Sequence, residues 1–348
     1  MTCARPIGDA RRRSWCGARR PARDLVVGIT LLAGTLTRPQ ALAAQSQAQR
    51  PPRTLGLQLD NDAFNFWLRP WRRSDDEYTS GVRVLLGESP LPWWRNRVWS
   101  RLDRCRRAED VCVTPLSWIG QDIYNPARDS HQEPRPDGRP NAGWLYLTQE
   151  LRCVYPASTE SVALTLGVTG PPALGETMQA LAHSAAPALN RPIDWSRQIQ
   201  FEPGIAVRYG RESMFLDDTS AVGVQLLRSG SVSAGNVLTE ATGALRARVG
   251  VSLQRPWLPI SNIARPEVAI TGSLTGHLVA HDLFLDGNTF RRSPRVKRNP
   301  FVLEQQAGFS VRARRFQLGY DVHWLTATYR GGPAHIWSSM SGGLLITR

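Results

Sequence analysis

From about residue 50 onward, apolar and polar side chains alternate along the chain. In Trp144–Val154 the even-numbered positions up to Arg152 carry polar or aromatic side chains, and the odd-numbered positions carry mostly apolar ones. The same period returns in residues 241–253, 265–278, 302–313 and 316–328. A period of two is that of a β-strand with one buried and one polar face, whereas a surface helix would show a period near 3.6.

The alternation predicts twelve strands. Their expected ranges are 54–62, 78–87, 114–123, 143–154, 161–169, 199–210, 220–228, 237–253, 264–278, 302–313, 316–328 and 335–347. An even number of antiparallel strands is typical of a closed bacterial membrane barrel.

Strands with one apolar and one polar face fit either a soluble sandwich or a membrane barrel. Spans of roughly ten residues suit a tilted membrane strand, the polar faces carry charge, and aromatic side chains near the strand ends fit interfacial girdles. The chain nevertheless ends in Ile346-Thr347-Arg348, where outer-membrane barrels usually have an aromatic residue. We predict an all-β fold: a twelve-stranded antiparallel transmembrane barrel with a short helix in a loop.

Two regions interrupt the strand rhythm. Residues 88–113 are rich in Trp, Arg and Cys and predict a long loop. Residues 171–198 predict a loop with a short helix, on which Glu176, Gln179 and His183 share one face because they are three and seven positions apart. This polar stripe is a candidate lining for a site.

The N-terminal region has the pattern of a secretory signal peptide. Arginines precede an apolar stretch at residues 25–36, and Ala41-Leu42-Ala43 gives a small-x-small cleavage site. We expect residues 1–44 to be removed and residues 45–348 to form the barrel. The basic segment before residue 25 is long for such a signal, so the true start could lie downstream, and a single membrane anchor is the alternative.

The net charge points to an anionic partner. The chain has 43 Lys and Arg against 29 Asp and Glu, with Lys297 as its only lysine. Such a balance attracts nucleic acid or an anionic lipid surface. Because export removes the chain from nucleic acid, we expect membrane lipid to be the partner.

The cysteines predict at most a loop disulfide. Cys3 and Cys16 would leave with the signal peptide, and Cys105 and Cys112 flank a short polar stretch that can be oxidised after export. Cys153 would then stay alone. We find no metal-binding spacing among the cysteines.

The first strand ends in Asp60-Asn61-Asp62, which places three oxygen-bearing side chains in succession. Such a set either ligates a hard cation such as Ca²⁺ or forms a solvated turn. On the second strand, parity pairs Thr79 with Arg83 and predicts that Thr79 points into the lumen.

His183 is the histidine best placed for chemistry, because it shares the loop helix with Gln179. A neutral imidazole can accept a proton from water near pH 7, although a solvated loop histidine is the simpler reading. Arg139, in Gly138-Arg139-Pro140, could hold a phosphate or carboxylate. The sequence has no nucleophile elbow, phosphate loop or His-Glu-x-x-His helix.

The ordered set of short motifs resembles the LpxR family of outer-membrane lipid A 3′-O-deacylases over roughly residues 54–347. The matching stretches are Asn61-Asp62 with Phe64, 78–83, 120–124, 139–146, 166–176, Gln179 with His183, 202–204, 234–237 and 287–290. The chain departs from the family pattern at Gly138, where a lysine is usual, and in Ser184–Asn190, which lacks an expected acid.

The resemblance implies a twelve-stranded outer-membrane barrel that removes the 3′-linked acyloxyacyl chain of lipid A in a Ca²⁺-dependent hydrolysis. It implies that Asn61 and Asp62 hold the metal, that Thr79 and Gln179 orient groups, and that Arg139 grips the substrate. It also implies lipopolysaccharide and outer-membrane lipids as partners, without nucleic acid, and we expect a monomer.

From these residue types we expect His183 to act as general base on water, with Ca²⁺ polarising the ester carbonyl. An outer-membrane phospholipase with a serine nucleophile is a second reading, but parity places no convincing Ser–His pair on the outer face. A non-enzymatic porin-like barrel is the third, although twelve strands leave a narrow lumen that side chains could fill.

Overall fold

The computed structural model describes residues 53–65, 67–68, 76–88, 112–129, 131, 133–185, 193–260 and 263–346. All of them belong to one compact unit, Arg50–Arg348. The expected signal peptide and the loop at residues 88–113 fall wholly or mostly outside the described residues, so both stay predictions.

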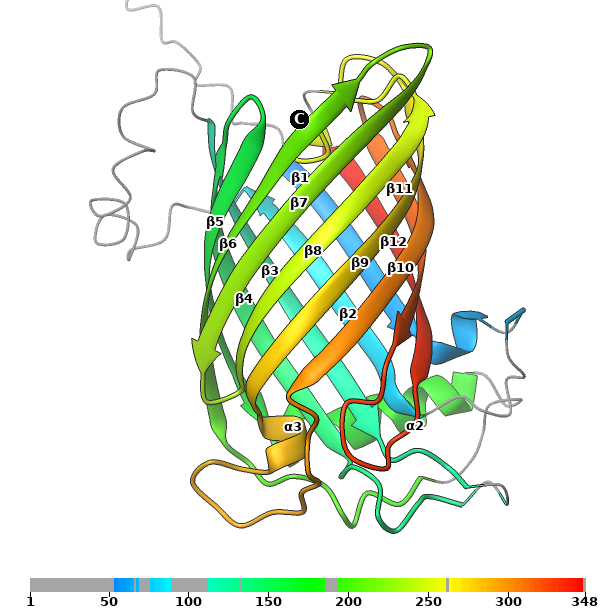
Figure 1. Ribbon diagram of the computed structural model, residues 1–348. Helices are drawn as coiled ribbons and strands as arrows, with labels where there is room; N and C mark the ends of the chain where they lie inside the picture. Colours follow the sequence, from blue (N-terminus) through cyan, green and yellow to red (C-terminus); the bar gives the residue numbers. More distant parts are fainter. Residues whose placement is uncertain are drawn as a thin grey trace, which may run out of the picture. The chain divides into compact units, whose positions relative to one another are not determined.

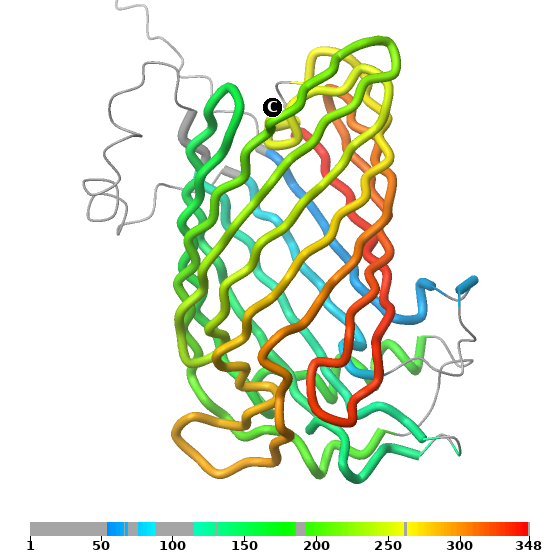
Figure 2. Tube along the Cα trace, viewed as in Figure 1, coloured from blue at the N-terminus to red at the C-terminus, as the bar shows by residue number. Residues whose placement is uncertain are grey.

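The described strands form one closed antiparallel barrel (Figure 1). In chain order they are β1 Arg53–Asn61, β2 Glu77–Glu88, β3 Cys112–Asn125, β4 Ala142–Val154, β5 Ser158–Thr169, β6 Pro203–Asp218, β7 Val222–Gly235, β8 Leu238–Val251, β9 Glu267–Asp282, β10 Phe301–Arg312, β11 Phe316–Leu325 and β12 His335–Ile346. Each strand pairs with its neighbours in the chain, and β1 pairs with β12 to close the barrel (Figure 2).

The predicted fold class and the twelve strands are therefore confirmed. The largest differences are in β6 and β7, which extend eight and seven residues beyond the predicted ends at 210 and 228. A register shift between Met214 and Leu216 breaks the alternation in β6. The extension of β7 is rich in Ser and Gly and carries little hydrophobic signal.

The apolar face of the strands points outward. On β4, Leu147 is 42% exposed, whereas Thr148 and Glu150 on the other face are buried. On β8 and β9 the most exposed large hydrophobic side chains are Leu245 and Ile270. A barrel that is apolar outside and polar inside matches a membrane-spanning barrel. The described helices include none that is long and apolar enough to cross a bilayer.

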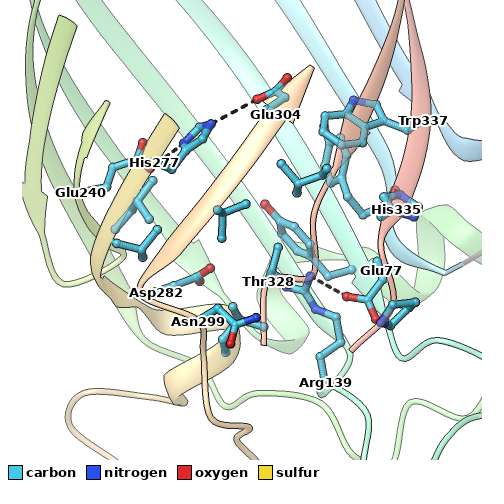
Figure 3. A pocket seen from close by; sticks show the side chains of 18 of the residues that line it. Glu77, Arg139, Glu240, His277, Asp282, Asn299, Glu304, Thr328, His335 and Trp337 are labelled. Atoms are coloured by element: carbon cyan, nitrogen blue, oxygen red, sulfur yellow. Dashed lines mark hydrogen bonds and ion pairs between the residues drawn. The ribbon is translucent and has the colours of Figure 1, made fainter. Parts of the chain in front are cut away.

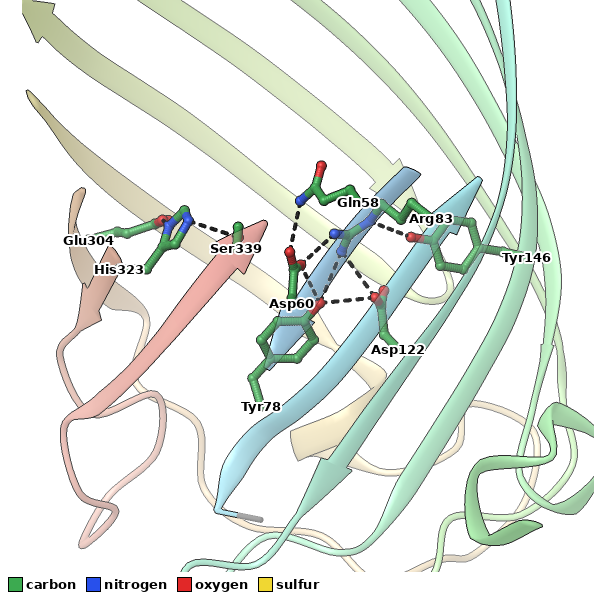
Figure 4. A network of polar contacts seen from close by, with 9 residues as sticks. All are labelled: Gln58, Asp60, Tyr78, Arg83, Asp122, Tyr146, Glu304, His323 and Ser339. Carbon is green, nitrogen blue, oxygen red and sulfur yellow. Dashed lines mark hydrogen bonds and ion pairs between the residues drawn. The ribbon is translucent and has the colours of Figure 1, made fainter. Parts of the chain in front are cut away.

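Charged networks fill part of the lumen. Arg83 donates to Asp60 at 2.5 Å and to Asp122 at 3.0 Å, and its Nε donates to the Tyr146 hydroxyl (Figure 4). Farther round the wall, His323 lies 2.7 Å from the Glu304 carboxylate. Cross-strand ion pairs of this kind satisfy buried charges within the barrel.

The two ends of the barrel differ. The end that carries α2 (Gly175–Ala185) and α3 (Leu283–Asp286) also carries the long connections 126–141, 170–202 and 283–300. At the opposite end three connections, 155–157, 219–221 and 313–315, are only three residues long, although 252–266 is longer. Outer-membrane barrels have short periplasmic turns and longer outer loops, so we take the end with α2 and α3 as the outer end.

Cys153 corrects one expectation. It is fully buried on β4 and forms a disulfide bond, so the prediction that it stays alone is wrong. Position 153 pairs with Val113 in the β3–β4 register, which brings the end of β4 beside the cysteine-bearing start of β3. The predicted Cys105–Cys112 pair lies outside the described side chains.

The Glu202 carboxylate links three outer connections through hydrogen bonds. Its carboxylate accepts hydrogen bonds from the side-chain amide of Asn236 at 2.8 Å, the side-chain amide of Asn288 at 3.2 Å and the backbone N–H of Phe290 at 3.3 Å. Burial alone would raise the pKa of Glu202, but these hydrogen bonds lower it below the ordinary value of 4.5. The folded protein therefore binds this proton more weakly than the unfolded chain.

We expect this stabilisation to be complete above pH 4.5 and to be lost as the pH falls through the lower folded pKa of Glu202. Hydrogen exchange of residues 287–290, corrected for intrinsic rates, should then accelerate. A Glu202→Gln variant should show weaker protection of this segment with little dependence on pH. An equal acid-induced loss of protection in both proteins would contradict the assignment.

Candidate active site

A bulge at the start of β2 turns Thr79 away from the lumen. Tyr78 pairs with Tyr124 and Ser80 with the next residue of β3, Ile123, so Thr79 is the extra residue in the ladder. The Tyr78 hydroxyl points inward and donates to Asp60 at 2.7 Å (Figure 4). The prediction that Thr79 faces the lumen with Arg83 is wrong, because the extra residue reverses the parity at that point.

Thr79 instead contacts the outer face of β3. Its hydroxyl donates to the Asn125 side-chain oxygen at 2.8 Å. Tyr124 lines the lumen, so Asn125, the next residue of the strand, projects to the outside. Gln121 shares that parity and donates to the backbone oxygen of Ala173, at 2.6 Å, in the short 3₁₀ helix η3 (Pro171–Ala173).

Helix α2 lies against this outer wall. Gly143 on β4 makes the close approach possible, because a Cβ there would lie 3.2 Å from both the Ala173 Cβ and the Gly175 nitrogen. The buried positions of α2 are Gly175, Gln179 and His183, which are four residues apart and form one stripe facing the wall.

The opposite side of α2 is exposed and partly apolar. Met178 and Leu181, and Leu174 just before the helix, are 41–57% exposed. Glu176 is also exposed, so only Gln179 and His183 of the predicted polar stripe are buried. The helix thus keeps Gln179 and His183 against the barrel, and its exposed side carries Met178 and Leu181 together with polar residues such as Glu176.

Asn125 connects the wall to the helix. Its side-chain oxygen accepts from Thr79 and also from the Gln179 amide at 2.9 Å, and its amide donates to Asn141 at 2.9 Å. The Trp195 indole donates to Gln179 at 3.1 Å. Sequence analysis missed Asn125, although it directly follows the 120–124 motif and its amide is only 1% exposed.

Asn61 and Asp62 lie beside this cluster. In the β1–β2 register Asn61 faces Ser80, the neighbour of Thr79. Asn61 shares the outward parity of the exposed Leu57, and Asp62 begins the 3₁₀ helix η1 (Asp62–Asn65). The buried Asp62 carboxylate accepts from the Asp76 backbone at 3.0 Å.

The oxygens of this turn suit a hard cation. The described residues contain no group of three or more His, Cys, Asp or Glu side chains fit for a metal ion. A cation here would depend on amide and backbone oxygens in addition to the Asp62 carboxylate. The fully buried Asn65 lies one 3₁₀ turn after Asp62, and its side-chain oxygen has no hydrogen-bond partner among the described residues. Asn61, Asp62 and Asn65 together offer the oxygen ligands that Ca²⁺ prefers.

Arg139 lies on the other side of the wall. It is buried in a lumenal cavity of about 390 Å³, with its guanidinium 3.6 Å from the Glu77 carboxylate and 4.4 Å above the Tyr124 ring (Figure 3). Tyr329 also donates to Glu77 at 2.9 Å, and burial together with the Glu77 charge raises the pKa of Tyr329, so its hydroxyl stays a donor.

These contacts hold the first residue of β2 in an uncommon conformation. Glu77 has φ 56°, which is rare for a residue with a side chain. It lies two positions before Thr79, so Arg139 and Tyr329 support the bulge from within. Contact of Arg139 with substrate stays a prediction.

The structure therefore brings Thr79 and Gln179 together through Asn125, with Asn61 and Asp62 next along the wall and His183 one helical turn beyond Gln179. Arg139 supports the same bulge from the lumen. The arrangement combines a buried imidazole, hydroxyl and amide donors, and a carboxylate, all close to the apolar outer surface.

An Asn125→Ala substitution should loosen α2. It would leave the Thr79 hydroxyl and the Gln179 amide buried without their acceptor, at a cost of about 1–3 kcal/mol. We expect faster hydrogen exchange in residues 175–185 and a lower unfolding temperature. Ser184→Ala, on the exposed side of the same helix, is the matched control. Unchanged protection of α2 in the Asn125 variant would contradict this role.

Comparisons with known proteins place this chain in a family. The family model described as "Outer membrane protein LpxR" matches residues 28–344. The structure of LpxR from Salmonella typhimurium aligns with a TM-score of 0.67 at 18% identity, covering 84% of this chain and 100% of that one. The β-domain of the Bordetella autotransporter BrkA aligns with a TM-score of 0.44 at 10% identity, covering 84% of this chain and 98% of that one. The search of curated proteins finds no match. The match over most of the length shows that this chain belongs to the LpxR family of outer-membrane proteins.

Proposed function

We propose that the protein is a lipid A 3′-O-deacylase, which hydrolyses the ester of the 3′-linked acyloxyacyl chain in the outer leaflet. Membership of the LpxR family supports the substrate class. The single observation that carries the proposal is the position of the polar cluster: Gln179 and His183 are buried on the wall-facing side of a helix whose other side exposes Met178 and Leu181. A lipid ester can approach such a site laterally from the membrane.

In the proposed reaction a ring nitrogen of His183 accepts a proton from water, and the resulting hydroxide attacks the ester carbonyl. The bond between the acyl carbon and the sugar oxygen breaks, and the protonated imidazole returns its proton to the sugar oxygen. The acyloxyacyl chain leaves as a free carboxylic acid, and the 3′-hydroxyl remains on the sugar. The hydrogen bonds of Thr79 and Gln179 through Asn125 fix the wall and helix relative to each other, so that the imidazole keeps its position.

Asn61, Asp62 and Asn65 would hold the Ca²⁺, which supplies positive charge for the oxyanion when it is bound. Arg139 lies on the lumenal side of the wall, whereas the ion would place its positive charge on the outer side. The substrate phosphates would be held by other groups, or by Arg139 after a local movement.

Mass spectrometry of lipid A tests this function. Lipid A from cells that express the protein should lose one acyloxyacyl group, and purified protein should perform the same reaction with Ca²⁺ but not with EDTA. A change confined to phospholipids would identify a phospholipase instead. Unchanged lipids together with conductance in a bilayer would identify a porin-like barrel. Chromatography in detergent should show a monomer.

A further inference from the structure

Two outer connections form a single rigid surface beside the barrel mouth. The β9–β10 connection and the β11–β12 connection are joined by backbone hydrogen bonds, from Asn299 to Thr328 at 2.8 Å and from Arg330 to Lys297 at 2.9 Å. An antiparallel bridge between Arg298 and Tyr329 lies between them. The side chains on this surface are therefore carried by a fixed backbone.

Arg298 anchors the surface to β9. Its Nε donates to Asp286 at 2.8 Å, and its two terminal nitrogens donate to the backbone oxygens of Val279 and Ala280. Asp286 also lies 3.3 Å from the His281 ring. The one acidic side chain of the surface is thus already engaged by neighbouring groups.

A cavity of about 650 Å³ opens on this surface. Its charged lining consists of Arg295, Lys297, Arg298 and Arg330 against Asp286 alone. The side chains of Arg295, Lys297 and Arg330 are exposed and form no ion pair with the acids in the part of the chain that the structure describes. Three cations without counter-charges on a rigid frame attract anions, and Arg in particular binds phosphate oxygens with paired hydrogen bonds.

We propose that this cationic cavity is a binding site for phosphate groups, and that its ligand at the outer surface is the phosphorylated saccharide of lipopolysaccharide. The position at the outer end supports this source, because the cavity opens where the sugars of the outer leaflet lie. The cavity is built from β9–β12 connections and shares no residue with the cluster of Thr79, Gln179 and His183. The proposal does not depend on the deacylation reaction.

Because Lys297 is the single lysine of the chain, occupancy of the cavity can be measured by the rate at which this side chain is acetylated. Acetylation of Lys297 by an amine-reactive ester can be followed by mass spectrometry of the peptide that contains it, in the full chain in detergent. The probes are phosphorylated saccharide from fully deacylated lipopolysaccharide, the same saccharide with its phosphates removed, and inorganic phosphate. We expect the phosphorylated saccharide to slow acetylation about tenfold at ten times its Kd, and the dephosphorylated one to leave the rate unchanged.

A double variant and a matched control distinguish binding in the cavity from nonspecific attraction by the positive charge of the protein. The double substitution Arg295→Ser with Arg330→Ser should weaken binding of the phosphorylated saccharide by about tenfold or more, because charge-assisted hydrogen bonds are lost. Arg291→Ser with Arg292→Ser removes the same charge from exposed positions of the same loop that do not line the cavity, and should leave protection intact. No hydrolysis is measured, so an inactive enzyme would not affect the result.

Four outcomes bear on the proposal. Absence of protection by every phosphate-bearing probe would overturn it, as would equal weakening in both double variants. Protection by inorganic phosphate as strong as that by the saccharide would keep the phosphate site but remove the saccharide as its source. Protection that needs the phosphorylated saccharide and the residues Arg295 and Arg330 would support both parts.

Discussion

Replacing His183 with alanine should lower the rate of lipid A deacylation by about 10²–10⁴-fold, because removal of a general base commonly costs this much. The side chain is buried on the wall-facing stripe of α2, so the loss should appear in kcat more than in KM. The measurement is release of the 3′ acyl chain from purified lipid A by the protein in detergent. The barrel should form as before, because His183 lies on a loop helix outside the strands.

His131→Ala is the matched control, since His131 is exposed on another outer connection. It should keep full activity, and both variants should show the same heat-dependent shift in electrophoretic mobility as the folded parent barrel. A His183→Gln variant that retains full activity would remove the imidazole from the mechanism, because glutamine preserves a hydrogen-bonding side chain but cannot serve as the base.

Asp62→Asn should raise the Ca²⁺ concentration required for half-maximal activity by about tenfold or more, because a neutral amide replaces the one carboxylate of the oxygen set and about 1.4 kcal/mol corresponds to each factor of ten. Asparagine can still accept the hydrogen bond from the Asp76 backbone, so the turn should keep its fold. Activity measured against free Ca²⁺, after treatment with chelator, checks this expectation.

Direct binding gives a readout that does not depend on catalysis. Calorimetric titration of Ca²⁺ should show weaker binding to the Asp62 variant than to the parent. Asp137→Asn, an exposed acid on an outer connection, should leave both the affinity and the activity profile unchanged. A variant at position 62 that needs no more Ca²⁺ than the parent would exclude this turn as the metal site.

The barrel could be predicted from the sequence because its physical cause is local. Lipid outside and ion pairs inside impose a two-residue period, which is visible in segments such as Trp144–Val154. The same rule failed at Thr79, because one extra residue after Glu77 reverses parity and leaves no trace in the pattern of hydrophobicity. The extension of β7 was missed for a similar reason, since Ser and Gly satisfy either face of a strand.

The site was predictable only in part. Gln179 and His183 share a helix face, so their common burial follows from spacing. The partnership of Asn125 with Thr79 and Gln179 joins three segments that are far apart in the chain, and no local pattern reports it. The lumenal position of Arg139 depends on contacts with Glu77 and Tyr124, which the sequence around Gly138 does not reveal.

The exposed apolar side chains on and beside α2 make the surrounding medium important for how this helix lies on the barrel. Leu174, Met178 and Leu181 keep about half of their surface exposed, so in water their hydration would disfavour this position of the helix, whereas hydrocarbon would remove that cost. The imidazole should therefore be held in place best at a lipid–water boundary. Activity should rise steeply once detergent or lipid assembles into aggregates, as for an interfacial enzyme, even toward a substrate that is itself monomerically dissolved.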